Sequence, residues 1–587
     1  MGMEKGSDTK TPTWCGLEPR RAFAVLGVGI AAVVLALVLG LTIGLLGNRD
    51  AGSSEASDPS IPRANLGYAV YRGTLVGDSG GVAQYLGIQY AKAPVGDLRF
   101  RAPVAPDTRW TGEEVKANKF GPVCLGISEP YPNADKDEDC LYANVWAPAN
   151  ATVESKLPVW LFIQGGGYTL NSSPNWNGTY VVQRSGNNIV FVNFNYRVGL
   201  FGFLASERVR TDGDLNAGLL DQRFVIRWLR QHVAQFGGDP DHIVVHGASA
   251  GAGSVALHLV ANGGNATDPE SGERLFAGAV GESVFFPAQP FVHELEWQFN
   301  LTLQRTGCDA GADDAMTCLR GKSTEDLQTA ANIPATFPGA PDLSTPLFFW
   351  TPCIDGDLLQ DLPYLLFERG QFIDVPVIMG STTDEGTVFA ANAATTEDMT
   401  AFLQSNYPLL SVSNTSAILE QYPQLDALPN HSIWFPSTAR AYGETTFICP
   451  GAHILNSYVR HLNTSRAWGY HYDVHDADNI AAGLGVPHVF SSWAIFGPDS
   501  EPGTSGPQSY HTYNAGVVPI MMDYWISFVR TLDPSPLRSA DSPPWQSWGP
   551  TEKRLLVQTG NVSTEVVSDD QEERCTFWKT LAPVMRQ

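Results

Sequence analysis

The sequence predicts an α/β fold, with a mostly parallel central sheet and helices on both faces. From residue 63 onward, apolar runs of strand length alternate with stretches of helical periodicity, a pattern typical of this class. The clearest helix is 219–237, whose apolar positions recur at three- and four-residue spacing. The best strand candidates are 157–164, 187–196, 242–247, 375–380 and 466–474.

Composition is that of a globular protein, with 43% apolar and 17% charged residues over 587 positions. This length would suggest several domains, but large α/β enzymes often form one unit. The formal charge of −24 disfavours non-specific nucleic-acid binding, which needs clustered lysine and arginine. It also repels anionic substrates at long range.

Residues 22–47 contain no charged side chain and are long enough to span a bilayer as a helix. They exceed the usual apolar core of a cleaved signal peptide. Four basic residues precede the segment and only Arg49 follows closely, so we expect residues 1–21 to be a cytosolic tail. The protein is then a single-pass type II membrane protein; the alternative is a long signal peptide and secretion.

Residues 48–62 are small, polar and proline-bearing, and we expect a flexible stalk before a single domain at 63–587. Sequons for N-glycosylation all lie after the membrane segment, which predicts a lumenal or extracellular glycoprotein. They begin at Asn150, Asn171, Asn177, Asn265, Asn300, Asn414, Asn430, Asn463 and Asn561.

Two serines lie in G-x-S-x-G pentapeptides, Ser79 in "GDSGG" and Ser249 in "GASAG". The first also matches the active-site spelling of trypsin-like proteases. Such an enzyme needs a histidine upstream of the serine, and the first histidine of the chain is His232. Ser79 lies between two strand-like runs, so we interpret it as a hairpin-turn residue.

Ser249 has the context of a nucleophile elbow, because a β-branched strand precedes it and a helix-forming run follows. The flanking Gly247 and Gly251 avoid clashes in this strained turn. A phosphate-binding loop would need a Lys-[ST] pair that is missing here. The glycines 165–167 follow a predicted strand, in the position of an oxyanion loop that supplies backbone N–H donors.

Seven further segments form a distinctive series along the chain. They are "EDCLYANVW" (138–146), "QGGGY" (164–168), "NYRVGLFGFL" (195–204), the run 216–251 that ends in "GASAG", "GSTTDEGTVF" (380–389), "GVPHVFSSWAIFG" (485–497) and "RCTFWKTLAP" (574–583). Together they resemble the type B carboxylesterase/lipase family, the cholinesterase-like branch of the α/β-hydrolases, over nearly all of 63–587. The resemblance implies an α/β-hydrolase fold and a serine esterase.

The resemblance assigns a catalytic triad to Ser249 as nucleophile, Glu385 as acid and His488 as general base. Asp384 is the rival acid in the same motif, and His475 is the fallback base. The order Ser, Glu, His is that of α/β-hydrolases and excludes every histidine upstream of the acid.

By the same resemblance, Gly166, Gly167 and Ala250 supply the oxyanion donors. The chemistry needs neither a metal nor an organic cofactor. The partners are an ester substrate, small or lipid-like, and the membrane through the N-terminal helix; the oligomeric state stays open.

The resemblance also implies three disulfides, fitting an oxidising compartment. It leaves Cys353 unpaired and places Cys15 on the cytosolic side. The implied pairs are Cys124 with Cys140, Cys308 with Cys318 and Cys449 with Cys575.

The chain departs from the family at Ala248, where glutamate is usual, and in the 125–139 loop, which has no tryptophan to stack on a cation. We therefore expect neutral esters rather than choline esters. The same loop is short and acidic, unlike the long flap of fungal lipases, which favours an esterase over a lipase or sterol esterase. Phe285 and Phe286 are candidates for an acyl pocket. A catalytically silent adhesion protein is the third alternative.

Overall fold

The computed structural model describes residues 61–107, 112–172, 175–268, 272–309, 311, 314–337, 340–463 and 465–587. The predicted tail (1–21), the membrane segment (22–47) and the stalk up to residue 60 lie outside these residues, as does Cys15. Among the helices of the described residues, none has the length and hydropathy of a membrane span. Residues 61–587 cluster as one unit.

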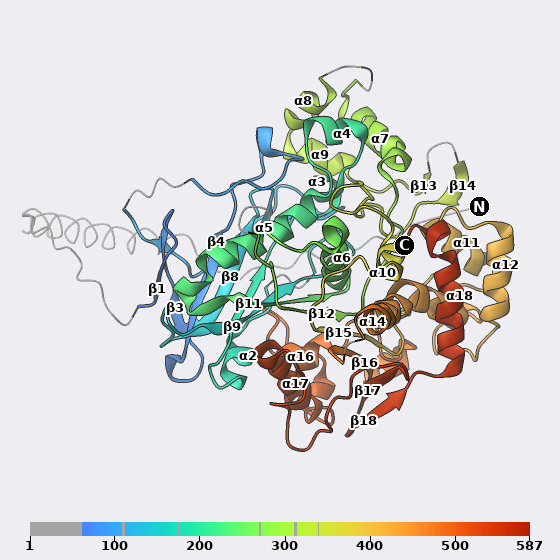
Figure 1. Ribbon diagram of the computed structural model, residues 1–587. Helices are drawn as coiled ribbons and strands as arrows, with labels where there is room; N and C mark the ends of the chain where they lie inside the picture. The colour runs from blue at the N-terminus through green and yellow to red at the C-terminus, as the bar shows by residue number, and fades with distance from the viewer. Residues whose placement is uncertain are drawn as a thin grey trace, which may run out of the picture. The chain divides into compact units, whose positions relative to one another are not determined.

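Eleven strands of the described chain form one large sheet (Figure 1). In spatial order they are β18 (Asn561–Val566), β17 (Lys553–Gln558), β16 (Ala467–Asp473), β15 (Val377–Thr382), β12 (Gly278–Glu282), β11 (Gly238–Ala248), β9 (Leu157–Ile163), β10 (Val190–Phe194), β8 (Tyr142–Pro148), β4 (Val82–Gln89) and β3 (Thr74–Val76). Seven neighbouring strands, β10, β9, β11, β12, β15, β16 and β17 in spatial order, run parallel to one another. Antiparallel strands extend the sheet at both edges. The prediction of a mostly parallel sheet is therefore confirmed.

Helices cover both faces of this sheet, as the apolar strands require. In β9, Leu161 belongs to the core on one face, whereas Trp160 belongs to the core on the other, because successive side chains alternate across a strand. The first core includes side chains of α5 (Ala217–His232), α6 (Ala250–Gly264), α10 (Pro363–Glu368) and α14 (Cys449–Leu462). The second includes side chains of α2 (Thr179–Arg184), α16 (Ser492–Phe496) and α17 (Val517–Thr531).

A third core lies over the ends of the central strands and contains Ala250 and Phe285 beside many helical side chains. Its helices are α3 (Gly199–Phe203), α4 (Glu207–Asp212), α7 (Glu296–Thr306), α8 (Ala315–Arg320), α9 (Thr324–Ala330), α11 (Thr396–Asn406), α12 (Val412–Gln421), α13 (Phe435–Gly443) and α18 (Asp569–Met585). The remaining helix is α15 (Ala477–Ala482), and a π-helical turn, η5 (Glu444–Ile448), joins α13 to α14.

Short elements complete the described chain. Ser79 lies in a single 3-10 turn between β3 and β4, so its interpretation as a turn residue is confirmed. The short strands are β1 (Arg63–Asn65), β2 (Val70–Arg72), β5 (Val115–Lys116), β6 (Val123–Cys124), β7 (Lys136–Asp137), β13 (Thr336–Phe337) and β14 (Ala340–Ser344). The 3-10 turns are η1 (Asp78–Gly80), η2 (Gly96–Leu98), η3 (Val233–Phe236), η4 (Val292–Leu295) and η6 (Gln508–His511).

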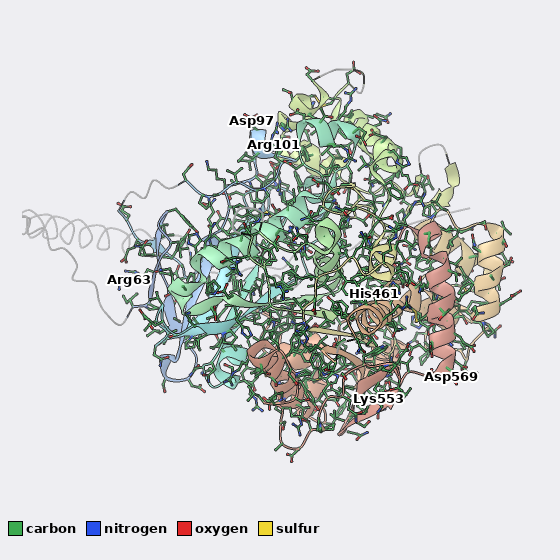
Figure 2. The ribbon with its side chains drawn as sticks, viewed as in Figure 1. Arg63, Asp97, Arg101, His461, Lys553 and Asp569 are labelled. Atoms are coloured by element: carbon green, nitrogen blue, oxygen red, sulfur yellow. A yellow bond between two sulfur atoms is a disulfide. The ribbon has the colours of Figure 1, made fainter. Side chains whose placement is uncertain are left out.

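The three disulfides join the pairs that the resemblance implies, Cys124–Cys140, Cys308–Cys318 and Cys449–Cys575. Cys353 is a buried free thiol. Exposed acidic side chains such as Asp97 and Asp569 lie at the periphery of the domain (Figure 2), as the net charge leads us to expect.

Candidate active site

Ser249 forms a sharp turn between β11 and α6. Its backbone has φ 57° and ψ −123°, a strained conformation for a non-glycine residue. A Cβ on Gly251 would lie 1.9 Å from the carbonyl oxygen of Ile163, and one on Gly247 would lie 2.1 Å from the carbonyl oxygen of Gly251. Both positions therefore require glycine. The turn leaves Ser249 half-buried, at the start of a helix where developing negative charge is stabilised.

The glycine loop 165–167 follows β9 and lies against this turn. A Cβ on Gly165 would be only 2.8 Å from the Cβ of Ser249. No described residue accepts a hydrogen bond from the N–H of Gly166 or Gly167. Ala250 is the first residue of α6, where an N–H has no intrahelical acceptor. These backbone groups are available to bind an oxyanion.

Glu385 is almost fully buried just beyond β15, and both of its carboxylate oxygens accept hydrogen bonds. Oε1 accepts from the backbone N–H of Thr382 and from the hydroxyl of Ser283, both at 2.7 Å. Oε2 accepts from Nδ1 of His488 at 2.5 Å. Because an ionised carboxylate only accepts, this contact places a proton on Nδ1 and leaves Nε2 as the basic nitrogen.

The rival residues lie elsewhere. The carboxylate of Asp384 accepts the backbone N–H of Val486 at 2.8 Å, so it fastens the loop ahead of His488 rather than the imidazole. Burial raises the pKa of Asp384. His475 is 62% exposed at its side chain and pairs with Asp473 at 3.3 Å. The structure therefore brings Glu385 and His488 together and leaves Asp384 and His475 outside this pair.

His488 is held by aromatic rings and points its free nitrogen inward. Its side chain is 6% exposed, and its ring lies 4.3 Å from that of Phe447 and 5.0 Å from that of Phe389. The buried Nε2 has no hydrogen-bond partner among the described residues. An unpartnered imidazole nitrogen in an apolar surrounding is suited to receive a proton from a hydroxyl group.

The parallel sheet explains why these residues gather. Ser249 and Glu385 follow the carboxyl ends of β11 and β15, which are separated only by β12. His488 follows β16, the next parallel strand, after α15. In open α/β sheets, functional groups meet at this carboxyl edge.

Four phenylalanine rings form a wall between the glycine loop and the histidine. Phe285 lies 4.7 Å from Phe348 and 5.4 Å from Phe447, and Phe389 lies 5.3 Å from Phe447, all between ring centroids. A Cβ on Gly167 would be 2.1 Å from the Phe348 ring. We call Phe285, Phe348, Phe389 and Phe447 the aromatic wall.

Only one of the two acyl-pocket candidates, Phe285 and Phe286, belongs to the aromatic wall. Phe285 belongs to it, whereas Phe286 packs against Tyr364 in the core on the other side. Ala248, at the position of the usual family glutamate, is 5% exposed and belongs to a hydrophobic core. No carboxylate therefore stands immediately before the serine to attract a cation.

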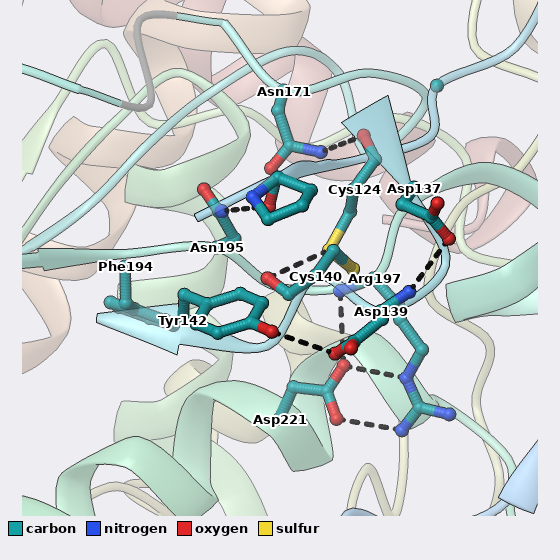
Figure 3. The surroundings of a disulfide bond; sticks show 12 residues. Cys124, Asp137, Asp139, Cys140, Tyr142, Asn171, Phe194, Asn195, Arg197 and Asp221 are labelled. Carbon is teal, nitrogen blue, oxygen red and sulfur yellow. Dashed lines mark hydrogen bonds and ion pairs between the residues drawn. A yellow bond between two sulfur atoms is a disulfide. The ribbon is translucent and has the colours of Figure 1, made fainter. Parts of the chain in front are cut away.

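Asn171, a predicted sequon, is a structural residue just after the glycine loop. Its Nδ2 donates to the carbonyl oxygen of Cys124 at 3.1 Å (Figure 3). Its Oδ1 accepts from Nε2 of Gln164 at 2.5 Å. The side chain is 7% exposed. Its amide connects the glycine loop to the Cys124–Cys140 disulfide loop.

Two contributors were not predicted from sequence. Ser283, which binds Glu385, and Phe348, which covers Gly167, act through contacts with segments far along the chain. The position of Ser283 directly after a buried strand is only a weak sequence signal for its role. A pair of phenylalanines in a loop gives no sequence signal for the role of Phe348. Both assignments need the strand order.

Comparison with known proteins decides the family. The model of the carboxylesterase family matches residues 62–578. The chain belongs to the carboxylesterase family. This confirms the predicted resemblance, and the chain is a carboxylic ester hydrolase.

Relatives of this carboxylesterase include lipases of fungi. It is 35% identical to Lipase 2 of Geotrichum candidum, over 62% of this chain and 70% of that protein. It is 30% identical to a secreted triacylglycerol lipase of Gibberella zeae, over 86% and 88%. The crystal structure of Aspergillus niger EstA superposes with a TM-score of 0.84 at 46% identity, covering 90% of this chain and 99% of that one. The α/β-hydrolase fold is thereby confirmed.

Proposed function

We propose that this carboxylesterase hydrolyses neutral carboxylic esters through an acyl-enzyme on Ser249, with His488 as base and Glu385 as triad acid. The observation that carries the proposal is the 2.5 Å contact from Nδ1 of His488 to the buried carboxylate of Glu385. This contact leaves Nε2 as a base on the same sheet edge as the Ser249 elbow.

The reaction follows from these positions. Nε2 of His488 takes the proton of the Ser249 hydroxyl as its oxygen attacks the ester carbonyl. The N–H groups of Gly166, Gly167 and Ala250 bind the oxyanion of the tetrahedral intermediate. Collapse expels the alcohol, which receives the proton from His488.

Water then repeats the sequence on the acyl-enzyme and releases the carboxylic acid. The carboxylate of Glu385 stabilises the imidazolium in both halves of the reaction. Every proton moves between serine, histidine, water and alcohol.

The preference for neutral esters rests on the aromatic wall and on Ala248. The wall presents apolar rings beside the reacting groups, and the chain carries a net charge of −24, which repels anionic esters. The loop closed by Cys124–Cys140 spans only 16 positions, too few for a long flap. We therefore place esterase ahead of lipase; lipase is the second candidate, favoured by the names of the fungal relatives.

We propose a lumenal or extracellular location for residues 63–587, which the three disulfides support. Retention by segment 22–47 makes the protein a type II membrane protein, whereas cleavage makes it secreted, as two relatives are by name. Sequencing of the mature N-terminus separates the two: a start near residue 51 means cleavage.

The test of the proposed function is hydrolysis of p-nitrophenyl acetate, butyrate and palmitate by the purified protein. We expect activity on the short esters, and a loss of at least about 10³-fold in kcat for Ser249→Ala. Ser79→Ala is the matched control and should keep full activity, since Ser79 lies in a turn. Full activity of Ser249→Ala would falsify the assignment, and long-chain preference at an interface would favour the lipase.

A further inference from the structure

Glu282 connects the segments that carry the serine and the histidine. It is fully buried at the end of β12, between β11 and β15. Its backbone carbonyl accepts the N–H of Ser249 at 2.9 Å. Its carboxylate oxygen Oε1 accepts the hydroxyls of Ser491 and Ser492, at 2.6 and 2.8 Å, just after His488 in the chain. The next residue, Ser283, holds Glu385.

The other carboxylate oxygen of Glu282 faces a histidine whose protonation is fixed by a tryptophan. Nε1 of Trp160 donates to Nδ1 of His246 at 3.1 Å. Because an indole N–H only donates, Nδ1 is unprotonated and the imidazole proton resides on Nε2. This Nε2 lies 3.6 Å from Oε2 of Glu282. Burial lowers the pKa of His246, in agreement with a neutral ring.

The remaining titratable neighbours of Glu282 include no positively charged side chain among the described residues. Three buried phenols interact electrostatically with this carboxylate: Tyr470 and Tyr472 on β16, and Tyr510 in η6. Burial raises the pKa of each phenol, which keeps it neutral. The other carboxylate nearby is Glu385, which also acts on Tyr470. Within the described residues, no lysine or arginine pairs with Glu282. Ser491 and Ser492 donate to Oε1 of Glu282, whereas Oε2 has no hydrogen-bond partner among the described residues.

We infer that Glu282 is a positioning residue of the esterase reaction, a second buried carboxylate that anchors the His488 loop and stabilises the imidazolium electrostatically. The inference rests on the proposed Ser249–His488 chemistry. A negative charge in a low-dielectric interior favours a nearby cation over a distance of several ångströms. Because the neighbouring side chains are neutral, the electric field of the Glu282 carboxylate is not cancelled. It therefore stabilises the imidazolium each time His488 accepts a proton.

Glu282→Gln tests the inference, because glutamine keeps the shape and removes the charge. With p-nitrophenyl butyrate from pH 4 to 9, we expect the acid limb of kcat/KM to move to lower pH by roughly one unit. The sign follows from the imidazolium, which is less stable without the anion. We also expect kcat at the optimum to fall about tenfold with KM within about twofold, as for an interaction made mainly in the transition state.

Glu282→Asp is the matched control, because it keeps the charge and loses the reach to Ser491 and Ser492. Its acid limb should stay at the wild-type pH while kcat falls. A folded Glu282→Gln enzyme with the wild-type acid limb overturns the inference, even if kcat is reduced. Activity of Ser249→Ala would overturn the proposed function instead, so the two failures are distinct.

A second pair of substitutions covers the case in which Glu282→Gln does not fold. Ser491→Ala with Ser492→Ala removes both hydroxyl donors from the carboxylate and frees the His488 loop. We expect kcat to fall at least about fivefold with KM unchanged. Wild-type kcat in this double variant contradicts the anchoring role.

Discussion

Phe348 joins the aromatic wall to the glycine loop. Its ring occupies the space that a side chain on Gly167 would need, and it lies 4.7 Å from Phe285. The ring therefore limits the room beside the proposed oxyanion loop. Acyl-chain length should be decided at this residue.

Phe348→Ala should shift the preference toward longer acyl chains. Each newly buried methylene contributes about 0.8 kcal/mol, so two of them raise kcat/KM for p-nitrophenyl octanoate relative to acetate by about tenfold. Phe224→Ala is the control, since that ring packs near Tyr90 at a distance of 6.4 Å on the α5 side of the sheet. If Phe348→Ala leaves the ratio of kcat/KM for octanoate and acetate unchanged, the aromatic wall does not line the acyl site.

Much of the site at the residue scale is predictable from local sequence. The Ser249 turn, the 165–167 loop and the order of Glu385 and His488 are all local or ordinal features. The roles of Glu282 and Ser283 are different, because they exist only where β12 lies between β11 and β15. One sequence does not fix that strand order. The burial of Asn171 was not predicted either, since a sequon spelling gives no measure of burial.

At the scale of elements, the sequence predicts the central strands β9, β10, β11, β15 and β16 but misses β12, which lies between β11 and β15. β9 and β16 match their predicted ranges within a residue or two, because both are buried on two faces and read as apolar runs. β11 extends four residues earlier than predicted, through the polar segment that starts at Gly238. The short strands β5, β6 and β7 have two residues each and lack a pattern long enough to detect.

The disulfide Cys449–Cys575 joins α14 to α18 and should be the most stabilising of the three. It closes a loop of 126 positions, against 10 for Cys308–Cys318. On the chain-entropy relation these loops correspond to about 5 and about 3 kcal/mol. Replacing both cysteines of each pair by serine should lower the thermal midpoint more for the longer loop.

Activity of the folded variant without Cys449–Cys575 should remain, because Arg574 of α18 still pairs at 2.7 Å with Glu444 of η5, the turn that leads into α14. Equal losses of thermal stability for the two pairs would contradict the entropic account. Loss of activity below the thermal midpoint would contradict a purely stabilising role.

The whole molecule should lose stability in mild acid because it buries neutral histidines. Burial, reinforced by Arg223, lowers the pKa of His258 to about 3, and burial lowers that of His453 to about 4. The unfolded chain binds these protons already near pH 6.5. The stabilisation is therefore complete above pH 6.5 and is lost as pH falls toward the folded values.

His258→Gln measures this effect. His258 alone should cost about 2 kcal/mol of unfolding free energy between pH 7 and pH 5. Urea denaturation at pH 7 and pH 5 gives the unfolding free energy of each protein. Between the two pH values the variant should lose about 2 kcal/mol less of this free energy than the wild type. Parallel losses in variant and wild type would assign acid sensitivity to other groups.

The contact of Gly251 with Ile163 has a consequence for evolvability. Ser249, the proposed nucleophile, is positioned by main-chain atoms that approach each other where no side chain fits. The backbone geometry at Ser249 therefore does not depend on the side chains of the aromatic wall. A library that randomises Phe285, Phe348 and Phe389 can explore new substrates while the hydrolytic machinery stays in place.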